Sequence, residues 1–115
     1  MSTDIYKGIG WLNKTKIGLC DNGLIYSGYG WGRVCIGCYD NGAVYSGHGF
    51  GKIQVGSYQG GNVFRGTGWS KTFIGSYKNG SIYFGTGWFS KSQVGSYVGA
   101  DGGAAAAALL LLLKE

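Results

Sequence analysis

Five copies of one short motif run along this chain, and this internal repeat constrains the fold more than any other feature. The pair Ile17-Gly18 returns at successive spacings of 19, 19, 19 and 20 residues. The later copies are Ile36-Gly37, Val55-Gly56, Ile74-Gly75 and Val94-Gly95. A second element lies between the copies, so the whole unit reads [IV]-[YF]-x-G-x-G-[WF]-x4-[IV]-G-S-Y. A unit of this length is sufficient for one two-stranded hairpin.

Two kinds of turn divide each unit into strands. Asn-Gly and Gly-Gly pairs supply the two positive φ values of a type I′ turn. They occur at Asn22-Gly23, Asn41-Gly42, Gly60-Gly61 and Asn79-Gly80. The opposite turns are expected near Asn13-Lys14, Gly32-Arg33, Gly51-Lys52, Ser70-Lys71 and Ser90-Lys91. We therefore predict an all-β fold with one terminal helix, in which residues 1–101 form a closed ten-stranded up-and-down β-barrel of five hairpin repeats.

The high glycine content of this chain indicates a folded backbone and not a disordered one. There are 25 glycines and no proline in 115 residues, but 16% of the residues are aromatic, whereas disordered chains are poor in aromatic residues. Alternation along the strands places Gly and Tyr on one face, as at Gly56 and Tyr58. A glycine inside a strand indicates a neighbouring ring or a close backbone. Which face lines the lumen, and whether the first and last strands pair, are left open by this pattern.

The C-terminal segment, residues 102–115, is a Gly-Gly pair followed by five alanines, five leucines, Lys114 and Glu115. Its helix propensity is high and it is apolar on all sides, so it must be buried or in lipid. At roughly 18 Å it is too short for a bilayer core of about 30 Å but matches the height of a small barrel. We predict that it fills the lumen, with Ala104 to Ala108 where the wall comes nearest; the alternatives are a membrane anchor or a frayed surface tail. The candidate lumen residues are Ala104, Ala108, Leu109 and Leu113.

The repeat consensus resembles a known family. Asn-Gly-x-[IV]-Tyr-x-Gly-x-Gly-Trp followed by Ile-Gly-Ser-Tyr, over residues 4–98, is similar to the five-fold class of β-flower proteins. The resemblance implies a shallow symmetric barrel of hairpins around an apolar channel, with no established activity. A looser similarity is to Tubby-type domains, which are barrels around a hydrophobic helix that bind phosphoinositides; this chain is much shorter and lacks a matching basic cluster. MORN repeats share only the Asn-Gly-x-Val-Tyr-x-Gly fragment.

Residues for catalysis are scarce. His48 is the only histidine and occupies a variable repeat position, and the acids lie in turns or near the chain ends, so no acid and base pair is expected. Cys35 and Cys38 are three apart in a strand and so face opposite sides, and the odd cysteine number does not indicate a disulfide framework. We predict that the protein is not an enzyme and has no cofactor or metal site.

The remaining candidates are surfaces. Four Trp and one Phe are expected near the rims: Trp11, Trp31, Phe50, Trp69 and Trp88. One cation per hairpin is expected at the neighbouring turns: Lys14, Arg33, Lys52, Lys71 and Lys91. This ring suits an anionic surface, although its simpler role is to keep the turns soluble and unpaired.

These surfaces predict a non-enzymatic binding or scaffold module for a lipid surface, a membrane-associated partner or another protein. In one version the terminal helix leaves the lumen and the vacated channel accepts an acyl chain. The alternative is a multivalent lectin whose rim aromatics stack on sugars. Nucleic-acid binding is disfavoured because, apart from this turn position, the Lys and Arg residues do not recur at any repeat position. The first residues lack the apolar run of a secretory signal, so the expected location is the cytoplasm, peripheral to a membrane. The oligomeric state is left open.

Overall fold

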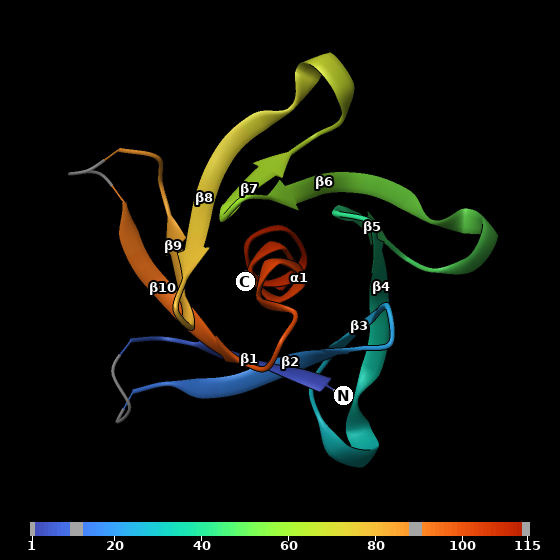
Figure 1. Ribbon diagram of the computed structural model, residues 1–115. Coiled ribbons are helices and arrows are strands. Elements are labelled where there is room, and N and C mark those ends of the chain that lie inside the picture. Colours follow the sequence, from blue (N-terminus) through green and yellow to red (C-terminus); the bar gives the residue numbers. More distant parts are fainter. Residues whose placement is uncertain (1, 10–12, 88–90, 114–115) are drawn as a thin grey trace.

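Ten antiparallel strands close into one ring, in the order in which they follow along the chain (Figure 1). The computed structural model describes residues 2–9, 13–87 and 91–113. The strands are β1 (Ser2–Lys7), β2 (Thr15–Asp21), β3 (Leu24–Ser27), β4 (Val34–Asp40), β5 (Ala43–Ser46), β6 (Ile53–Gln59), β7 (Asn62–Arg65), β8 (Thr72–Lys78), β9 (Ser81–Phe84) and β10 (Ser92–Val98). The predicted fold class, a closed up-and-down barrel with one C-terminal helix, is confirmed.

The ring closes where the two ends of the chain meet. β1 pairs antiparallel with β10, and Ile5 lies opposite Tyr97 in this pair. The same register, an Ile or Val opposite the last aromatic of the repeat, joins Val44 to Tyr39 in the β4–β5 hairpin. The first strand therefore closes the ring by pairing with the last, and none of the ten described strands keeps an open edge.

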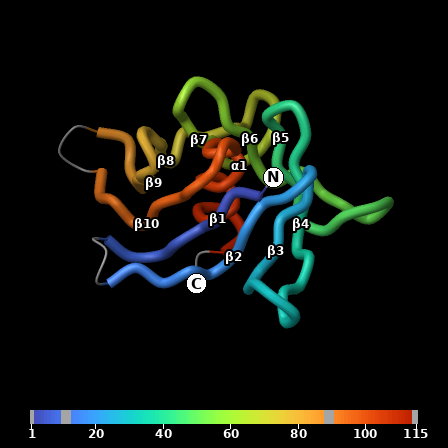
Figure 2. Tube along the Cα trace, turned by 60° about the horizontal axis from the view of Figure 1, so that its bottom comes forward, coloured from blue at the N-terminus to red at the C-terminus, as the bar shows by residue number. Residues whose placement is uncertain are grey.

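Two types of connection give the barrel two different ends. Both central residues of the two-residue turns have positive φ, for example 51° at Asn22 and 82° at Gly23, as a type I′ turn requires. At the other end, the 3₁₀ helices η1 (Gly30–Gly32), η2 (Gly49–Gly51) and η3 (Gly68–Ser70) connect the hairpins. We call these the Asn-Gly end and the tip end. The molecule measures 40 × 37 × 24 Å and is therefore a flat disc, from which the tips extend outward (Figures 1 and 2).

Each pair of strands that leads to a tip contains a β-bulge, always at the same repeat position. The strand register shifts between Ile25 and Tyr26 opposite β4, and between Val44 and Tyr45 opposite β6. The register skips Ile36 in the first case and Val55 in the second, which are the Ile or Val of the recurring Ile-Gly or Val-Gly pair. Bulges bend strands and increase their twist. The repeated pair is thus the point at which the wall curves.

A helix stands in the middle of the ring. α1 (Gly102–Ala107) continues into the π-helical segment η4 (Ala108–Leu112), and Figures 1 and 2 show it enclosed by strands in both views. We call residues 102–113 the lumen helix. Ala105 to Ala108 are fully buried, together with the inward-facing Ile or Val of every hairpin. These wall residues are Ile5, Ile25, Val44, Val63 and Ile82. The face that the sequence left open is therefore settled: Ile25, Gly37 and Tyr39 face the lumen.

Candidate functional site

The lumen is filled by a one-to-one match between leucines and glycines. Each of the five leucines packs over the glycine of one Ile-Gly or Val-Gly pair. Leu109 lies over Gly95, Leu110 over Gly75, Leu111 over Gly56, Leu112 over Gly37 and Leu113 over Gly18. A Cβ atom built on Gly56 would lie 2.5 Å from the Cδ1 atom of Leu111, a separation that side chains do not tolerate. The same Cβ would also collide with the backbone carbonyl of Phe64.

The π-helical turn explains how consecutive leucines reach consecutive hairpins. Five hairpins around a ring are about 72° apart, whereas an α-helix advances about 100° per residue. A π-helix closes its hydrogen bonds from i to i+5 and is therefore wider. Leu113 N–H donates such a bond to the Ala108 carbonyl oxygen at 2.8 Å. The wider turn brings the spacing of the leucines closer to the spacing of the wall.

The sequence analysis did not find this match. It named Ala104, Ala108, Leu109 and Leu113 for the lumen, and all four are buried there. It placed the alanines nearest the wall, but the close contacts with the wall glycines come from the leucines. The sequence did contain one signal of this packing, because the number of consecutive leucines, five, equals the number of Ile-Gly or Val-Gly pairs.

The other half of the lumen helix lies among tyrosines. Tyr58, Tyr77 and Tyr97 lie against Gly102 and Gly103, where a Cβ atom would collide with their rings. Tyr77 and Tyr97 also meet edge to face, with ring centroids 6.3 Å apart. Burial raises the pKa of Tyr58 to about 12. These rings are packing residues of the core, since two glycines at the start of the helix make room for them.

The first repeat has Cys20 in place of the tyrosine, and the chain enters the lumen there. Cys20 is fully buried and lies opposite Thr3 in the β1–β2 pair. The Asp101 N–H donates to the Thr3 hydroxyl at 2.9 Å, and the Tyr39 hydroxyl donates to the Asp101 carboxylate at 2.9 Å. Burial, with a smaller contribution from Asp101, raises the pKa of the Cys20 thiol to about 12. Burial and the bond to Asp101 likewise raise the pKa of Tyr39. The small Cys20 therefore leaves space for the segment that leads into the helix.

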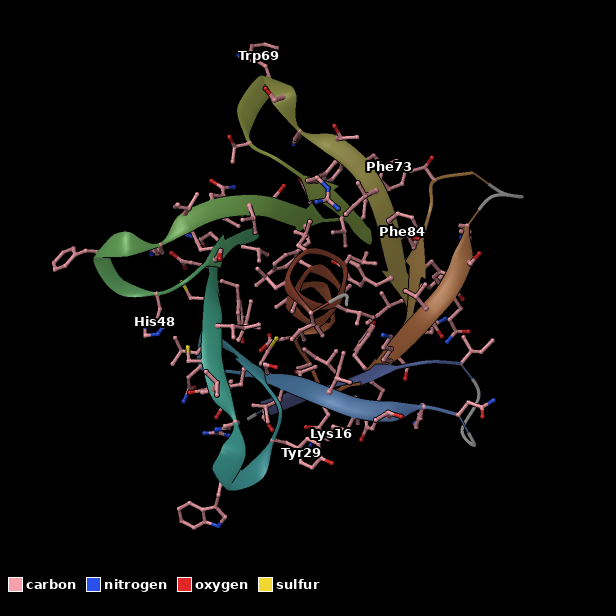
Figure 3. All side chains as sticks on the ribbon, turned by 180° about the vertical axis from the view of Figure 1, so that it is seen from behind. Lys16, Tyr29, His48, Trp69, Phe73 and Phe84 are labelled. Carbon is pink, nitrogen blue, oxygen red and sulfur yellow. The ribbon has the colours of Figure 1, made fainter. Side chains whose placement is uncertain are left out.

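The rim aromatics that the structure describes lie at the tips and are fully exposed. The relative exposures are 106% for Trp31, 112% for Phe50 and 105% for Trp69. Figure 3 shows Trp69 pointing away from the barrel at the end of its hairpin. Trp11 and Trp88 lie outside the described residues. Rings without burial contribute little to folding, so these three side chains are available for a partner.

The five predicted cations follow the repeat, and each lies over an aromatic ring on the outer face of the wall. The distances from the cation to the ring centroid run from 4.2 to 4.8 Å. The pairs are Lys14–Tyr6, Arg33–Tyr26, Lys52–Tyr45, Lys71–Phe64 and Lys91–Tyr83. A cation–π contact at an exposed site contributes about 0.5 to 1 kcal/mol. The cations therefore connect each tip to its own hairpin and leave their charge at the tip end.

Charge is separated between the two ends of the barrel. The cations of the tip end are Lys7, Lys14, Arg33, Lys52, Arg65, Lys71 and Lys91. Among the residues that the structure describes, no Asp or Glu lies at this end: Asp4, Asp21, Asp40 and Asp101 are all in the Asn-Gly half. Lys16, which lies over the Tyr29 ring, also reaches Asp4 at 3.1 Å. The net charge of +5 is thus concentrated at one end.

Apolar side chains are exposed at this same end. Val34 and Ile53 begin their strands on the lumen-facing side and are 60% and 68% exposed. Phe84 follows the inward-facing Ile82 by two residues and is half exposed. Leu111 and Leu112, near the end of the lumen helix, are only partly buried. The tip end therefore combines apolar side chains with positive charge.

Other candidate chemistry is sparse. His48 is exposed at the start of the second tip (Figure 3). Within residues 2–9, 13–87 and 91–113, no group of three His, Cys, Asp or Glu side chains could hold a metal ion. In the same part of the chain, none of the helices has the length and apolar character needed to cross a lipid bilayer.

Comparisons with protein-family models, curated proteins and solved structures found no match to this chain.

Proposed function

We propose that this chain is a non-enzymatic binding module that docks through its tip end on an anionic lipid membrane. One observation carries the proposal: fully exposed aromatic side chains, one per hairpin at Trp31, Phe50 and Trp69, stand at the end that carries the cations. Trp is enriched at membrane interfaces, because its amphipathic ring suits the boundary between headgroups and acyl chains. Each Lys or Arg near an anionic surface adds about 1 kcal/mol.

The lumen helix has a structural role in this proposal. Release of the helix would expose the leucines and would leave empty the space over the five wall glycines that they cover. Burial of a leucine side chain contributes roughly 1.5 to 3 kcal/mol, so releasing the five leucines would cost about as much as the whole free energy of unfolding of a typical domain. The surface, and not a vacated channel, is therefore the proposed contact. A location peripheral to a membrane follows from it, and location in the cytoplasm stays a prediction.

The resemblance to the five-fold β-flower proteins also stays a proposal. It is supported by the closed ring of equivalent hairpins and by the apolar lumen. Since that family has no established activity, the resemblance adds no ligand to the argument above.

Vesicle co-sedimentation tests the membrane proposal. We expect binding to vesicles with anionic lipid, weak binding to neutral vesicles, and loss of binding as salt increases. The triple variant Trp31→Ala, Phe50→Ala, Trp69→Ala should bind at least tenfold more weakly, while its thermal unfolding is unchanged. The matched control is Lys78→Gln, which removes a cation from the Asn-Gly end and should bind like the parent.

Two outcomes contradict the proposal. Equal recovery with neutral and anionic vesicles would exclude the electrostatic contribution, and normal binding by the triple variant would exclude the tips. The alternative of sugar stacking on the same rings predicts a different result: neutral sugars would change the fluorescence of Trp31 and Trp69, and vesicles would not bind.

A further inference from the structure

Two adjoining hollows lie on the outer face of the wall, away from the lumen, and the smaller one extends to the connection between β9 and β10. Their volumes are about 280 and 350 Å³, and both are lined by Asn62, Ser76 and Lys91. Asn62 of β7 lies opposite Ser76 of β8, and Ser76 lies opposite Tyr83 of β9. The register thus places three polar side chains in one row across three strands. Together the hollows form a shallow groove between the fourth and fifth hairpins.

The groove has cations, hydroxyl groups and an aromatic ring. Lys91 is held with its Nζ atom 4.8 Å from the centroid of the Tyr83 ring. Lys78 lines the larger hollow, and Thr86 and Phe73 line the smaller one. Phe73 is 38% exposed, and one side of its ring packs on Phe64 with centroids 5.7 Å apart. Figure 3 shows Phe73 on β8, the middle strand of the row. The exposed part of this ring is left for a ligand.

The other repeats show that this combination is not required by the fold. The row equivalent to Asn62–Ser76 is Asp4–Leu19, Leu24–Cys38, Ala43–Ser57 or Ser81–Ser96 in the other hairpins. The position of Lys78 is occupied elsewhere by Asp21, Asp40, Gln59 and Val98. All these hairpins close the same barrel with apolar, acidic or neutral residues. A pair of cations beside an amide and hydroxyl groups therefore occurs at one groove out of five.

We propose that this groove binds an anionic saccharide, that is, a sugar unit carrying a carboxylate or sulfate. Lys78 and Lys91 match the negative charge. The Asn62 amide and the hydroxyls of Ser76 and Thr86 match ring hydroxyls, which both donate and accept hydrogen bonds. Phe73 packs against the apolar face of the ring. Hollows near the lower limit of about 300 Å³ for ligand pockets suit one sugar unit each.

Titration followed by ¹⁵N NMR tests this inference with four probes: a sulfated disaccharide, a uronic-acid disaccharide, the neutral disaccharide and sodium sulfate. We expect the two anionic sugars to shift the signals of Asn62, Ser76 and Thr86, and the neutral sugar to bind at least tenfold more weakly. Asn62→Ala, which introduces the residue found at the equivalent position Ala43, should weaken binding at least fivefold. Lys78→Gln with Lys91→Gln should weaken it at least tenfold. Lys52→Gln is the matched control and should stay within twofold of the parent.

Several results would overturn the inference. The first is the absence of signal shifts with both anionic sugars, and the second is equal affinity for the neutral sugar. The third is a loss of affinity in Lys52→Gln as large as in the double lysine variant, which would indicate only general charge attraction. Sulfate alone causing the same shifts at the same affinity would reduce the groove to an anion site. The triple tip variant separates this inference from the membrane proposal, because it should keep its sugar binding while losing its vesicle binding.

Discussion

Gly51 and Gly56 are five residues apart in the same repeat, yet they have different structural roles. Gly51 lies in a tip, and a Cβ atom added there would meet nothing within 4 Å. Gly56 lies in the wall, where the same atom would collide with the carbonyl of Phe64 and the side chain of Leu111. Aromatic residues differ in the same way, because Tyr58 packs on Gly103 while Phe50 is fully exposed.

This difference separates the wall of the barrel from its tips. On the lumen side of the bulge, the space beside the lumen helix limits which side chains fit: glycine leaves room for the leucines, and the tyrosine rings pack against Gly102 and Gly103. Beyond the bulge the hairpins turn outward, and residues of the same types at the outermost positions, such as Gly51 and Phe50, pack against no other part of the protein. Stability is therefore expected to depend on the wall, and binding on the surfaces.

The largest expected effect is that of Gly56→Ala. The substitution should destabilise the protein by about 3 kcal/mol or more, because a backbone carbonyl lies in the way and cannot turn aside as a side chain can. Urea denaturation measures the effect. Gly51→Ala is the control and should change the free energy of unfolding by less than about 0.5 kcal/mol. Equal effects at the two positions would contradict the division into wall and tips.

Leu110→Ala should follow, with a loss of about 3 kcal/mol. Leu110 is 2% exposed and fills the space over Gly75, so its removal leaves a cavity. Trp69→Ala removes a larger side chain from a tip and should cost less than about 0.5 kcal/mol. Both values come from chemical denaturation. An unchanged midpoint for Leu110→Ala would mean that the helix is not packed in the lumen.

Cys20→Tyr tests whether the repeat can be made uniform. It introduces the tyrosine of the other repeats, but the chain segment around Asp101 already crosses this position. Overpacking should therefore cost about 2 kcal/mol. Cys38→Ser also restores a repeat residue, but on the outer face of the wall, and should lie within about 0.5 kcal/mol of the parent. A stable Cys20→Tyr variant, measured by thermal unfolding, would show that the space is not limited.

Alkaline pH should destabilise the folded protein through the buried wall residues Cys20 and Tyr58. The pKa values of Cys20 and Tyr58 are raised to about 12 from 9.0 and 10.0, so the folded protein retains these protons when the unfolded chain has lost them. Stability should therefore be constant below pH 9 and should fall between pH 9 and 12. Denaturation at a series of pH values measures this slope. The slope should be smaller in Cys20→Ala, and an identical slope would exclude this thiol as a source.

The smallest expected effect is at the base of a tip. Lys52→Met removes the charge over the Tyr45 ring and should cost about 0.5 kcal/mol in thermal or chemical denaturation. Lys52→Arg should retain the contact, since Arg33 occupies the equivalent position in the preceding repeat. A loss well above 1 kcal/mol for Lys52→Met would mean that the tips carry part of the stability of the wall.

The sequence was sufficient to predict the hairpin turns, the closed barrel and the C-terminal helix, because these depend on local signals. Asn-Gly pairs determine turn geometry within four residues, strand alternation determines faces, and an all-apolar segment can only be buried or in lipid. The exposed tip aromatics and the regular cations also follow from the repeat positions of Trp31 and Lys52.

Only the tertiary structure decided how these parts meet. The match of Leu111 with Gly56, the pairing of β1 with β10 and the space that Cys20 leaves for Asp101 depend on residues that are distant in sequence. The groove at Asn62 and Lys91 likewise depends on side chains from neighbouring hairpins. Local patterns specify each hairpin, but closing a ring around a helix is a packing problem, and its solution depends on which atoms of different repeats occupy the same space.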